Sequence, residues 1–254
     1  MKKARIIARL DVKGPNVIKG VHLECLRVVG KPGPLATKYY EEGADELLYM
    51  DIVASLYGRD NLLEIVNQAS DHIFIPFTVG GGVRSLDDMK ALLKAGADKV
   101  AINTMATKDS SLITRAAQMF GSQCVVISIE AKKTGEDHWE AFTDNGRERT
   151  GLDVVSWAKK AEELGAGEIL LTSIDTEGTQ KGYDIELIKK ITENANIPVI
   201  ACGGAGNAED VAACIVEGKT DAVAVASVLH YDVSSIGEIK ETLEQRGIPV
   251  RKND

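Results

Sequence analysis

The chain has 254 residues, 44% of them hydrophobic, and its 38 acidic and 30 basic side chains give a formal net charge of −8. This charge argues against nonspecific binding of nucleic acid, but it leaves open local phosphate sites made from backbone N–H groups. The apolar part of the N-terminus is too short for a signal peptide, and no later apolar run reaches membrane-spanning length, so we expect a soluble, cytoplasmic protein that contacts no membrane.

Short apolar runs alternate eight times with amphipathic stretches of helical period. The expected strands are residues 5–10, 46–52, 74–79, 99–102, 124–129, 168–173, 198–202 and 222–226. Ser85 and Asn207 are expected to cap helix N-termini, and the expected helix ends are Gly43, Gly96, Gly165 and Gly218. Strict alternation predicts a parallel sheet, and eight units in this length favour a closed barrel over an open, doubly wound sheet. The predicted fold is therefore α/β, a single (β/α)8 TIM barrel domain over residues 1–254.

The two halves of the chain, approximately residues 1–121 and 122–254, resemble each other. Four pairs of segments keep the same order at an offset of about 120 residues. They are 10–13 with 129–132, 50–52 with 174–176, 78–82 with 200–204, and 101–104 with 224–227. One match could arise by chance, whereas four in order predict two (βα)4 half-barrel repeats. The largest interruption, residues 134–150, is polar and contains a candidate hairpin at 138–142 that could cover an active site.

Glycine turns follow the third and seventh predicted strands, at Gly80-Gly81-Gly82 and Gly203-Gly204. Glycine lets backbone N–H groups approach an anion closely, and a helix N-terminus adds favourable partial charge. The strand after each turn ends in small residues, Asn103-Thr104 or Ala226-Ser227. A lone Gly-Gly pair could simply form a tight turn. Two symmetric copies predict two phosphate sites, and hence a long ligand with a phosphate at each end.

Asp11 and Glu130 end the first and fifth strands, which lie across a barrel from each other. Two opposed carboxylates can divide acid and base roles at one substrate. The alternative is a structural ion pair with Lys13, Lys132 or other loop cations. Asp51 and Asp175 form a second such pair, for which the structural interpretation is stronger.

Lys19, just beyond the first strand, could contact an anionic substrate from a mobile loop or could simply be solvated. Four charged residues open strands one, two, four and six: Arg5, Glu46, Lys99 and Glu168. They could pair into a ring across the barrel bottom, although charges are also common where strands begin. The four histidines are scattered and no metal motif is visible, so we expect neither a metal nor a cofactor. The four cysteines have no CxxC spacing, and we interpret them as reduced thiols rather than as disulfides or metal ligands.

These residues resemble the HisF family, the cyclase subunit of imidazole glycerol phosphate synthase, over essentially the full chain. The matching segments are 5–8, 10–13, 17–20, 45–47, 76–82, 96–100, 102–104, 120–123, 165–175 and 203–206. The sister barrel of the pathway, the phosphoribosylformimino isomerase, shares the half-barrel repeat. Residues 165–175 and the four charges at the strand starts look like the cyclase.

The resemblance implies a lyase of histidine biosynthesis. A HisH-like glutaminase subunit, docked at the N-terminal face, would make ammonia that travels through the barrel. At the other end, ammonia would attack a bisphosphorylated aminoimidazole carboxamide ribulosyl substrate. The products would be imidazole glycerol phosphate and aminoimidazole carboxamide ribotide.

The resemblance also implies roles for individual residues. Asp11 and Glu130 would be catalytic, and Lys19 would help to hold substrate on the first loop. Asp51 lies among the expected substrate-binding residues. One phosphate would contact Gly82, Asn103 and Thr104, and the other would contact Glu177, Gly178, Gly204, Ala226 and Ser227. The ammonia gate would consist of Arg5, Glu46, Lys99 and Glu168.

The chain departs from the family pattern mainly at the mouth. Glu130 and Glu177 stand where Asp is usual, Val53 stands where Thr is typical, and residues 21–26 differ from the usual first loop. Arg9 replaces a small residue beside Asp11, and we expect it to point away from the face of Asp11. A carboxylate moved by roughly one bond can cost about 10²-fold in rate. Two alternatives therefore stay open: a related subunit that delivers ammonia to another acceptor, such as a surface sugar, and a barrel that binds ligand without catalysis.

Overall fold

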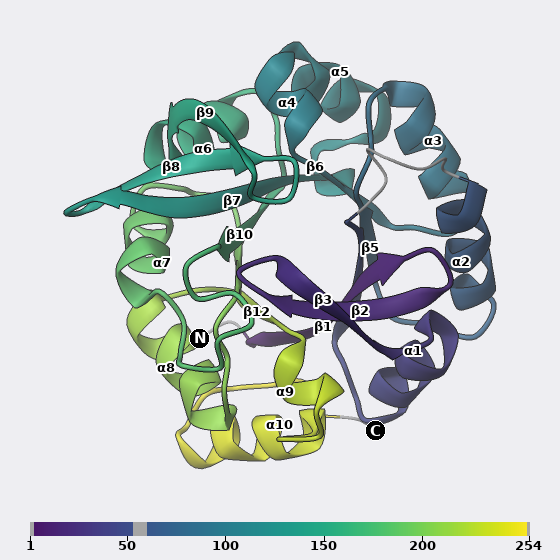
Figure 1. The fold of residues 1–254 in the computed structure, drawn as a ribbon, viewed down its shortest axis with the longest axis vertical. Coiled ribbons are helices and arrows are strands. Elements are labelled where there is room, and N and C mark those ends of the chain that lie inside the picture. Colours follow the sequence, from purple (N-terminus) through teal and green to yellow (C-terminus); the bar gives the residue numbers. More distant parts are fainter. Residues whose placement is uncertain (1–2, 53–59, 253–254) are drawn as a thin grey trace.

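The computed structural model describes residues 3–52 and 60–252 of the chain. Val53, one of the departures noted above, lies outside these ranges. Eight parallel strands form the barrel: β1 (Arg5–Lys13), β4 (Glu46–Asp51), β5 (Phe77–Gly80), β6 (Lys99–Ile102), β7 (Val125–Gly135), β10 (Glu168–Ser173), β11 (Val199–Cys202) and β12 (Ala222–Val225). They pair in the order β1-β4-β5-β6-β7-β10-β11-β12, and β12 pairs with β1 to close the ring (Figure 1). The predicted closed barrel is confirmed.

The helices surround the ring of strands (Figure 1). They are α1 (Pro32–Glu41), α2 (Asp60–Ser70), α3 (Leu86–Lys94), α4 (Thr104–Lys108), α5 (Ser111–Phe120), α6 (Val154–Glu163), α7 (Ile185–Thr192), α8 (Ala208–Gly218), α9 (Ser227–His230) and α10 (Ile236–Gln245), with a 3-10 turn at Ser122–Cys124. Because one face of each strand meets the helices and the other the barrel interior, strands such as β10 are buried throughout. No helix in the described part of the chain is long and apolar enough to cross a membrane.

The predicted helix ends are confirmed with one exception. Ser85 and Asn207 each accept a hydrogen bond from the backbone N–H three residues on, at 3.2 and 2.9 Å. Gly43, Gly96 and Gly165 have positive φ just after their helices. Gly218 is instead the last residue of α8, and the left-handed residue is Lys219, with φ of 55°. A Cβ at position 218 would lie 2.8 Å from Ile188 Cγ2, so close packing between α7 and α8 accounts for this glycine.

The predicted third strand, residues 74–79, begins too early. Phe74 is 79% exposed, and β5 begins only at Phe77. Pro76 precedes the strand and accepts a hydrogen bond from Leu47 through its carbonyl. The apolar character of the segment before Phe77 therefore reflects an exposed aromatic side chain and not a buried strand.

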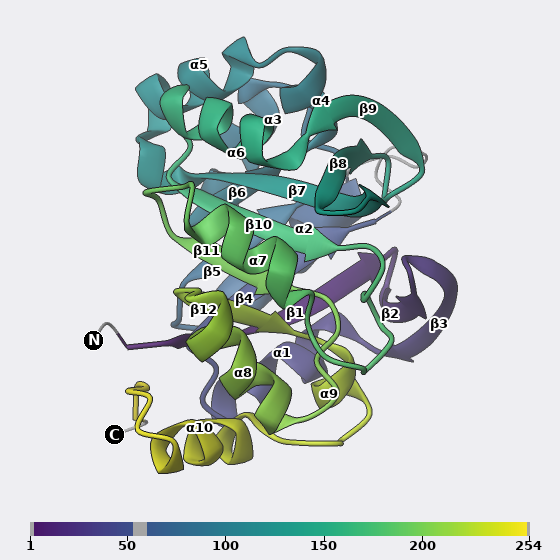
Figure 2. The same cartoon turned by 90° about the vertical axis from the view of Figure 1, so that its left-hand side faces the viewer.

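Two antiparallel hairpins extend the barrel at the C-terminal ends of its strands (Figure 2). β1 and β7 continue past the barrel, and β1 pairs with β2 (Asn16–Val21), which pairs with β3 (Glu24–Gly30). β7 pairs with β8 (His138–Thr143), which pairs with β9 (Glu148–Asp153). An antiparallel hairpin is therefore present in this segment, but residues 138–142 form only one of its strands, β8. The β2–β3 hairpin was not expected, because its residues lack a clear two-residue alternation.

Strand register supports the half-barrel correspondence at three of its four segment pairs. Asp11 lies opposite Met50, and Glu130 lies opposite Thr172. Met50 and Thr172 are therefore equivalent, so Asp51 corresponds to Ser173. The alignment of Asp51 with Asp175 was wrong by two residues, because it matched an aspartate near the end of each strand and did not follow the strand register.

The barrel interior is layered along its axis. Side chains two apart on β1 share a face, so Arg5, Ile7, Arg9 and Asp11 follow one another from the N-terminal to the C-terminal end. An apolar layer above Arg5 includes Ile7, Leu48, Ala101, Val126, Leu170 and Ala222. The interior therefore passes from charged, through apolar, to polar at the end that carries the hairpins.

Candidate active site

Asp11 and Glu130 lie at the C-terminal ends of the barrel portions of β1 and β7, as the sequence predicted. Asp11 is only 4% exposed. It accepts hydrogen bonds from Arg9 Nε at 2.8 Å and from Lys19 Nζ at 3.3 Å. Lys13 and Lys132 are exposed, and it is another cation of the first loop region, Lys19, that pairs with Asp11, as the structural alternative allowed.

Arg9 therefore points toward Asp11, and the expectation that it points away was wrong. Residues two apart on a strand lie on the same face, and only immediate neighbours alternate. Burial of Asp11 opposes its ionisation, but the adjacent charges of Arg9 and Lys19 prevail and hold its pKa at about 2. Asp11 is consequently an ionised carboxylate at every physiological pH.

Glu130 has the opposite character. Burial raises its pKa to about 7, although the backbone N–H of Gly146 and the charge of Arg9 both favour the ionised form. Gly146 N donates to Glu130 Oε2 at 2.7 Å. Gly146 follows the β8 strand in the turn to β9, so the hairpin predicted as a cover contacts this carboxyl group directly. The two carboxyl groups thus differ in protonation at neutral pH, as acid and base roles require.

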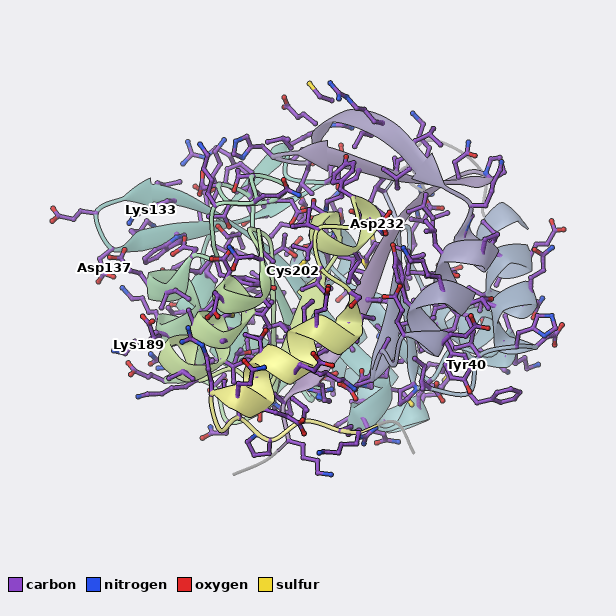
Figure 3. The ribbon with its side chains drawn as sticks, turned by 90° about the horizontal axis from the view of Figure 1, so that it is seen from below. Tyr40, Lys133, Asp137, Lys189, Cys202 and Asp232 are labelled. Atoms are coloured by element: carbon purple, nitrogen blue, oxygen red, sulfur yellow. The ribbon has the colours of Figure 1, made fainter. Side chains whose placement is uncertain are left out.

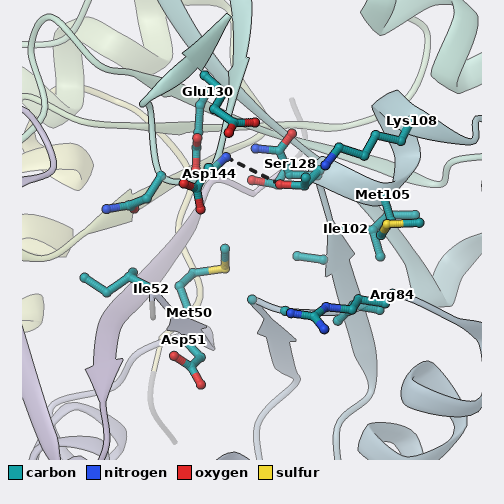
Figure 4. A pocket seen from close by; sticks show the side chains of 18 of the residues that line it. Met50, Asp51, Ile52, Arg84, Ile102, Met105, Lys108, Ser128, Glu130 and Asp144 are labelled. Atoms are coloured by element: carbon teal, nitrogen blue, oxygen red, sulfur yellow. Dashed lines mark hydrogen bonds between the residues drawn. The ribbon is translucent and has the colours of Figure 1, made fainter. Parts of the chain in front are cut away.

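A cavity of about 430 Å³ lies in the first half of the mouth (Figure 4). Its lining includes Glu130 together with four predicted site residues, Asp51, Gly82, Asn103 and Thr104. Gly81 has φ of +99°, and a Cβ there would lie 2.1 Å from the carbonyl oxygen of Asp51. Glycine is therefore required by the backbone here, and the resulting turn opens onto the cavity.

The second cradle gathers the other predicted phosphate residues. A space of only about 10 Å³ is lined by Lys19, Glu177, Gly178, Gly204, Ala226 and Ser227, among others. Gly204 has φ of +114°, and a Cβ there would lie 2.0 Å from the carbonyl oxygen of Gly182. The two glycine turns are thus equally constrained, but the second cradle is nearly filled by side chains.

Lys19 fills much of this cradle. It lies on β2, is 3% exposed, and forms ion pairs with Asp11 and Glu177. The alternative of a solvated lysine is wrong. Burial lowers its pKa and the neighbouring carboxylates raise it, with a net increase. The backbone N–H of His22 also donates to the carbonyl of Glu177 at 2.8 Å, which docks the β2–β3 hairpin on the segment after β10.

Asp51 and Asp175 do not form a matched pair. Asp51 lines the cavity of the first cradle. Asp175 is exposed and accepts a hydrogen bond from the backbone N–H of Lys133 at 2.8 Å. This contact is structural, although it is a backbone hydrogen bond and not the expected ion pair with a loop cation.

The structure brings the four charges at the strand starts into one ring at the opposite end. Arg5 donates to Glu46 at 2.7 Å and to Glu168 at 2.5 Å. Lys99 donates to the same two carboxylates at 2.9 Å each. Glu46 and Glu168 are 4% and 5% exposed, so alternating charges satisfy carboxylates that would be costly to bury alone. A depression of about 310 Å³ opens below the ring, lined in part by Lys3, Gln123 and Asp221.

Sequence reasoning missed several residues of the cavity. Arg84 and Lys108 line its wall, with Arg84 opposite Glu130 (Figure 4). Ser128 lies one layer below Glu130 on β7 and also lines it. A basic residue just after the glycine turn, and another at the end of α4, were the available signals for a phosphate site.

Across residues 3–52 and 60–252, no group of three or more His, Cys, Asp or Glu side chains is placed to hold a metal ion. All four cysteines are free thiols. Cys202 belongs to the buried apolar cluster that includes Ile7 and Leu170. Lys133 and Asp137 of the β7–β8 hairpin lie at the periphery of the molecule (Figure 3).

Known proteins resemble this chain along most of its length. A model of the histidine biosynthesis protein family matches residues 5–235. The imidazole glycerol phosphate synthase subunit HisF of Legionella pneumophila is 64% identical over 210 residues, which cover 83% of this chain and 99% of the relative. The HisF subunit of Dehalococcoides mccartyi strain BAV1 is 50% identical over 251 residues, 99% of each chain. That of Nostoc sp. is 48% identical over 254 residues, 99% of this chain and 98% of the relative.

Proposed function

The chain belongs to the HisF family, and we propose that it is an active ammonia-dependent cyclase of histidine biosynthesis. Its substrates are ammonia and a bisphosphorylated aminoimidazole carboxamide ribulosyl compound. Its products are imidazole glycerol phosphate and aminoimidazole carboxamide ribotide. The observation that carries this proposal is the pair of carboxyl groups in different protonation states, Asp11 and Glu130, between two glycine cradles.

The cradles hold the two ends of the substrate. Gly82, Asn103 and Thr104 bind one phosphate beside the basic side chains of Arg84 and Lys108. Glu177, Gly178, Gly204, Ala226 and Ser227 surround the other phosphate, and Lys19 supplies the cation. Since Lys19 is paired with Glu177, the arriving phosphate competes with a carboxylate of the protein for this ammonium group. Asp51 lines the wall between the first cradle and the centre.

Asp11 and Glu130 handle the protons. Addition of ammonia to a carbonyl carbon requires a proton to be taken from nitrogen, and loss of water requires one to be given to oxygen. Asp11, ionised above about pH 2, is in the form that can accept the first proton, and the charges of Arg9 and Lys19 that hold its pKa low make it a weak base. Glu130, with a pKa of about 7, still carries a proton to donate near neutral pH. The longer Glu130 side chain thus supplies the acid role at the position where the family usually has Asp.

Ammonia enters from the ring of Arg5, Glu46, Lys99 and Glu168. The ring closes the N-terminal end with four ion pairs, and the apolar layer above it favours neutral ammonia over ammonium, because burying an unpaired charge is costly. A HisH-type glutaminase subunit docks on the same face, over the depression beside Arg5 and Lys99. This placement delivers ammonia to the axis of the barrel.

A direct assay tests the proposal. Purified protein is given the bisphosphorylated substrate with an excess of ammonium salt near neutral pH, where much of Glu130 carries its proton, and imidazole glycerol phosphate is measured by chromatography. Product formation that is lost in Asp11→Asn supports the proposal. A folded protein that makes no product contradicts it and favours delivery of ammonia to another acceptor, such as a surface sugar. One observation favours that second candidate, namely the bulky Arg9, which is buried beside Asp11 and lines the cavity. A barrel that only binds ligand would give bound substrate without either product.

A further inference from the structure

Arg9 crosses the interior of the barrel, between the charged ring at its N-terminal end and the mouth at its C-terminal end. It extends from β1 and donates through Nη1 to Thr172 Oγ1 on β10 at 3.2 Å and to Cys202 Sγ on β11 at 3.0 Å. Its Nε donates to Asp11 at 2.8 Å. The side chain is 4% exposed, so these three contacts hold the guanidinium in one orientation.

The contacts leave part of the guanidinium unused. An arginine side chain has five N–H donors, one on Nε and two on each terminal nitrogen. The contacts of Arg9 use Nε and Nη1, and within the described part of the chain nothing accepts a hydrogen bond from Nη2. In the described part of the chain, the side-chain atoms that are both fully buried and without a hydrogen-bond partner are Trp157 Nε1, Ser173 Oγ and His230 Nε2. Arg9 Nη2 is not among them, so it is not fully buried. Because Arg9 lines the 430 Å³ cavity, its spare donors border that space.

The charges around Arg9 indicate what kind of group these donors meet. Arg9 and Lys19 are balanced by Asp11 and Glu177, so this buried set has no net charge. The spare N–H groups therefore need a hydrogen-bond acceptor and no additional anion. A carbonyl or hydroxyl oxygen satisfies this need, and leaving such donors without an acceptor in a closed site would cost about 1–3 kcal/mol.

We propose that Arg9 is a substrate-binding residue, whose Nη2 donates hydrogen bonds to an oxygen of the carbon chain that joins the two phosphates. This inference rests on the proposed function and deepens it. Thr172 and Cys202 are positioning residues, which fix the guanidinium from the far side. Arg9 thereby makes the middle of the substrate, and not only its two phosphates, a determinant of specificity. The second half-barrel has no arginine that corresponds to Arg9, since Ser128 occupies the equivalent position on β7.

The test compares Arg9→Met with wild type in the ammonium-dependent reaction. We expect kcat/KM to fall about 10- to 100-fold, the loss typical for a hydrogen bond from a charged donor, with much of it in KM. The inhibition constant of inorganic phosphate, which reports mainly on the cradles, should change much less than kcat/KM, because Arg9 reaches Lys19 only through their shared partner Asp11. Arg246→Met removes a distant surface charge, paired with Glu209 on α8, and serves as the matched control.

Chemical rescue distinguishes the loss of the Arg9 contact with substrate from a loss of folded structure. Arg9→Ala is assayed with methylguanidinium and, at the same concentration, with methylammonium. Recovery of kcat/KM with the first compound alone supports a contact that needs the forked donor. If Arg9→Lys and Arg9→Met fold but leave KM unchanged, or if phosphate inhibition weakens as much as substrate binding, the proposal is overturned. A wild-type protein that yields no product would instead contradict the proposed function, so the two failures are distinguishable.

Discussion

Replacing Glu130 by glutamine removes the proton donor while keeping the size of the side chain. Burial raises the pKa of Glu130 to about 7, against about 4.3 for an exposed glutamate, so about half of the molecules carry the proton at pH 7 and about 1% at pH 9. Removing a general acid typically costs about 10²- to 10⁴-fold in rate. The amide oxygen of glutamine can still accept the hydrogen bond from Gly146 N, so the β8–β9 turn should stay in place.

The assay is the pH profile of kcat at saturating bisphosphorylated substrate, with rates expressed per concentration of unprotonated ammonia. Because the protonated form of Glu130 is the active one, wild-type kcat should be level below about pH 6.5 and fall about tenfold per pH unit above pH 7. Asp11 is ionised over the whole range and contributes no limb there. In Glu130→Gln the limb near pH 7 should vanish, together with most of the activity.

Glu140→Gln is the matched control. Glu140 lies on the neighbouring strand β8, is 5% exposed and pairs with Arg149 instead of facing the cavity. This variant should keep the limb near pH 7. Persistence of that limb in Glu130→Gln, or a wild-type rate that rises through pH 7, would refute the assignment of Glu130 as the acid.

Three further outcomes are expected. Asp11→Asn leaves the cations of Arg9 and Lys19 without their shared anion and should lower the free energy of unfolding by about 3–5 kcal/mol in urea titrations at pH 7. Because the pKa of Asp11 is lower in the folded protein than in the unfolded chain, its stabilisation is present above about pH 4 and is lost as the pH falls toward 2. The difference in unfolding free energy between variant and wild type should therefore shrink between about pH 4 and pH 2. Gly204→Ala should cost about 1–3 kcal/mol and weaken inhibition by phosphate, whereas Gly33→Ala, where a Cβ meets nothing within 4 Å, should do neither. Lys99→Met removes two of the four ion pairs in the ring and should change the ratio of glutamine-dependent to ammonium-dependent product formation in the complex with the glutaminase; an unchanged ratio would argue against a gate.

Local sequence patterns were sufficient for the barrel and for the location of its site. Apolar runs and helix caps such as Ser85 and Asn207 depend on neighbouring residues only, so they can be interpreted from the sequence alone. The glycine turns could also be recognised locally, because positive φ at Gly81 and Gly204 favours glycine, whereas the carbonyl oxygens that leave no room for a Cβ there come from other parts of the chain. The position of Asp11 and Glu130 after apolar strands then predicted that both lie at the mouth, since the C-terminal ends of parallel strands meet on one face of the barrel.

The protonation and pairing of those residues depended on the tertiary structure. Lys19 lies 158 residues from Glu177 in sequence, and their ion pair exists only because the β2–β3 hairpin docks on the segment after β10. Arg9 reaches Thr172 and Cys202 across the barrel, contacts that no local pattern encodes. The sequence by itself determined which residues end the strands and where the backbone needs glycine. Only the closed barrel decided which charges neutralise one another. Nearby cations lower the pKa of Asp11, whereas burial raises the pKa of Glu130, and both effects depend on the tertiary structure.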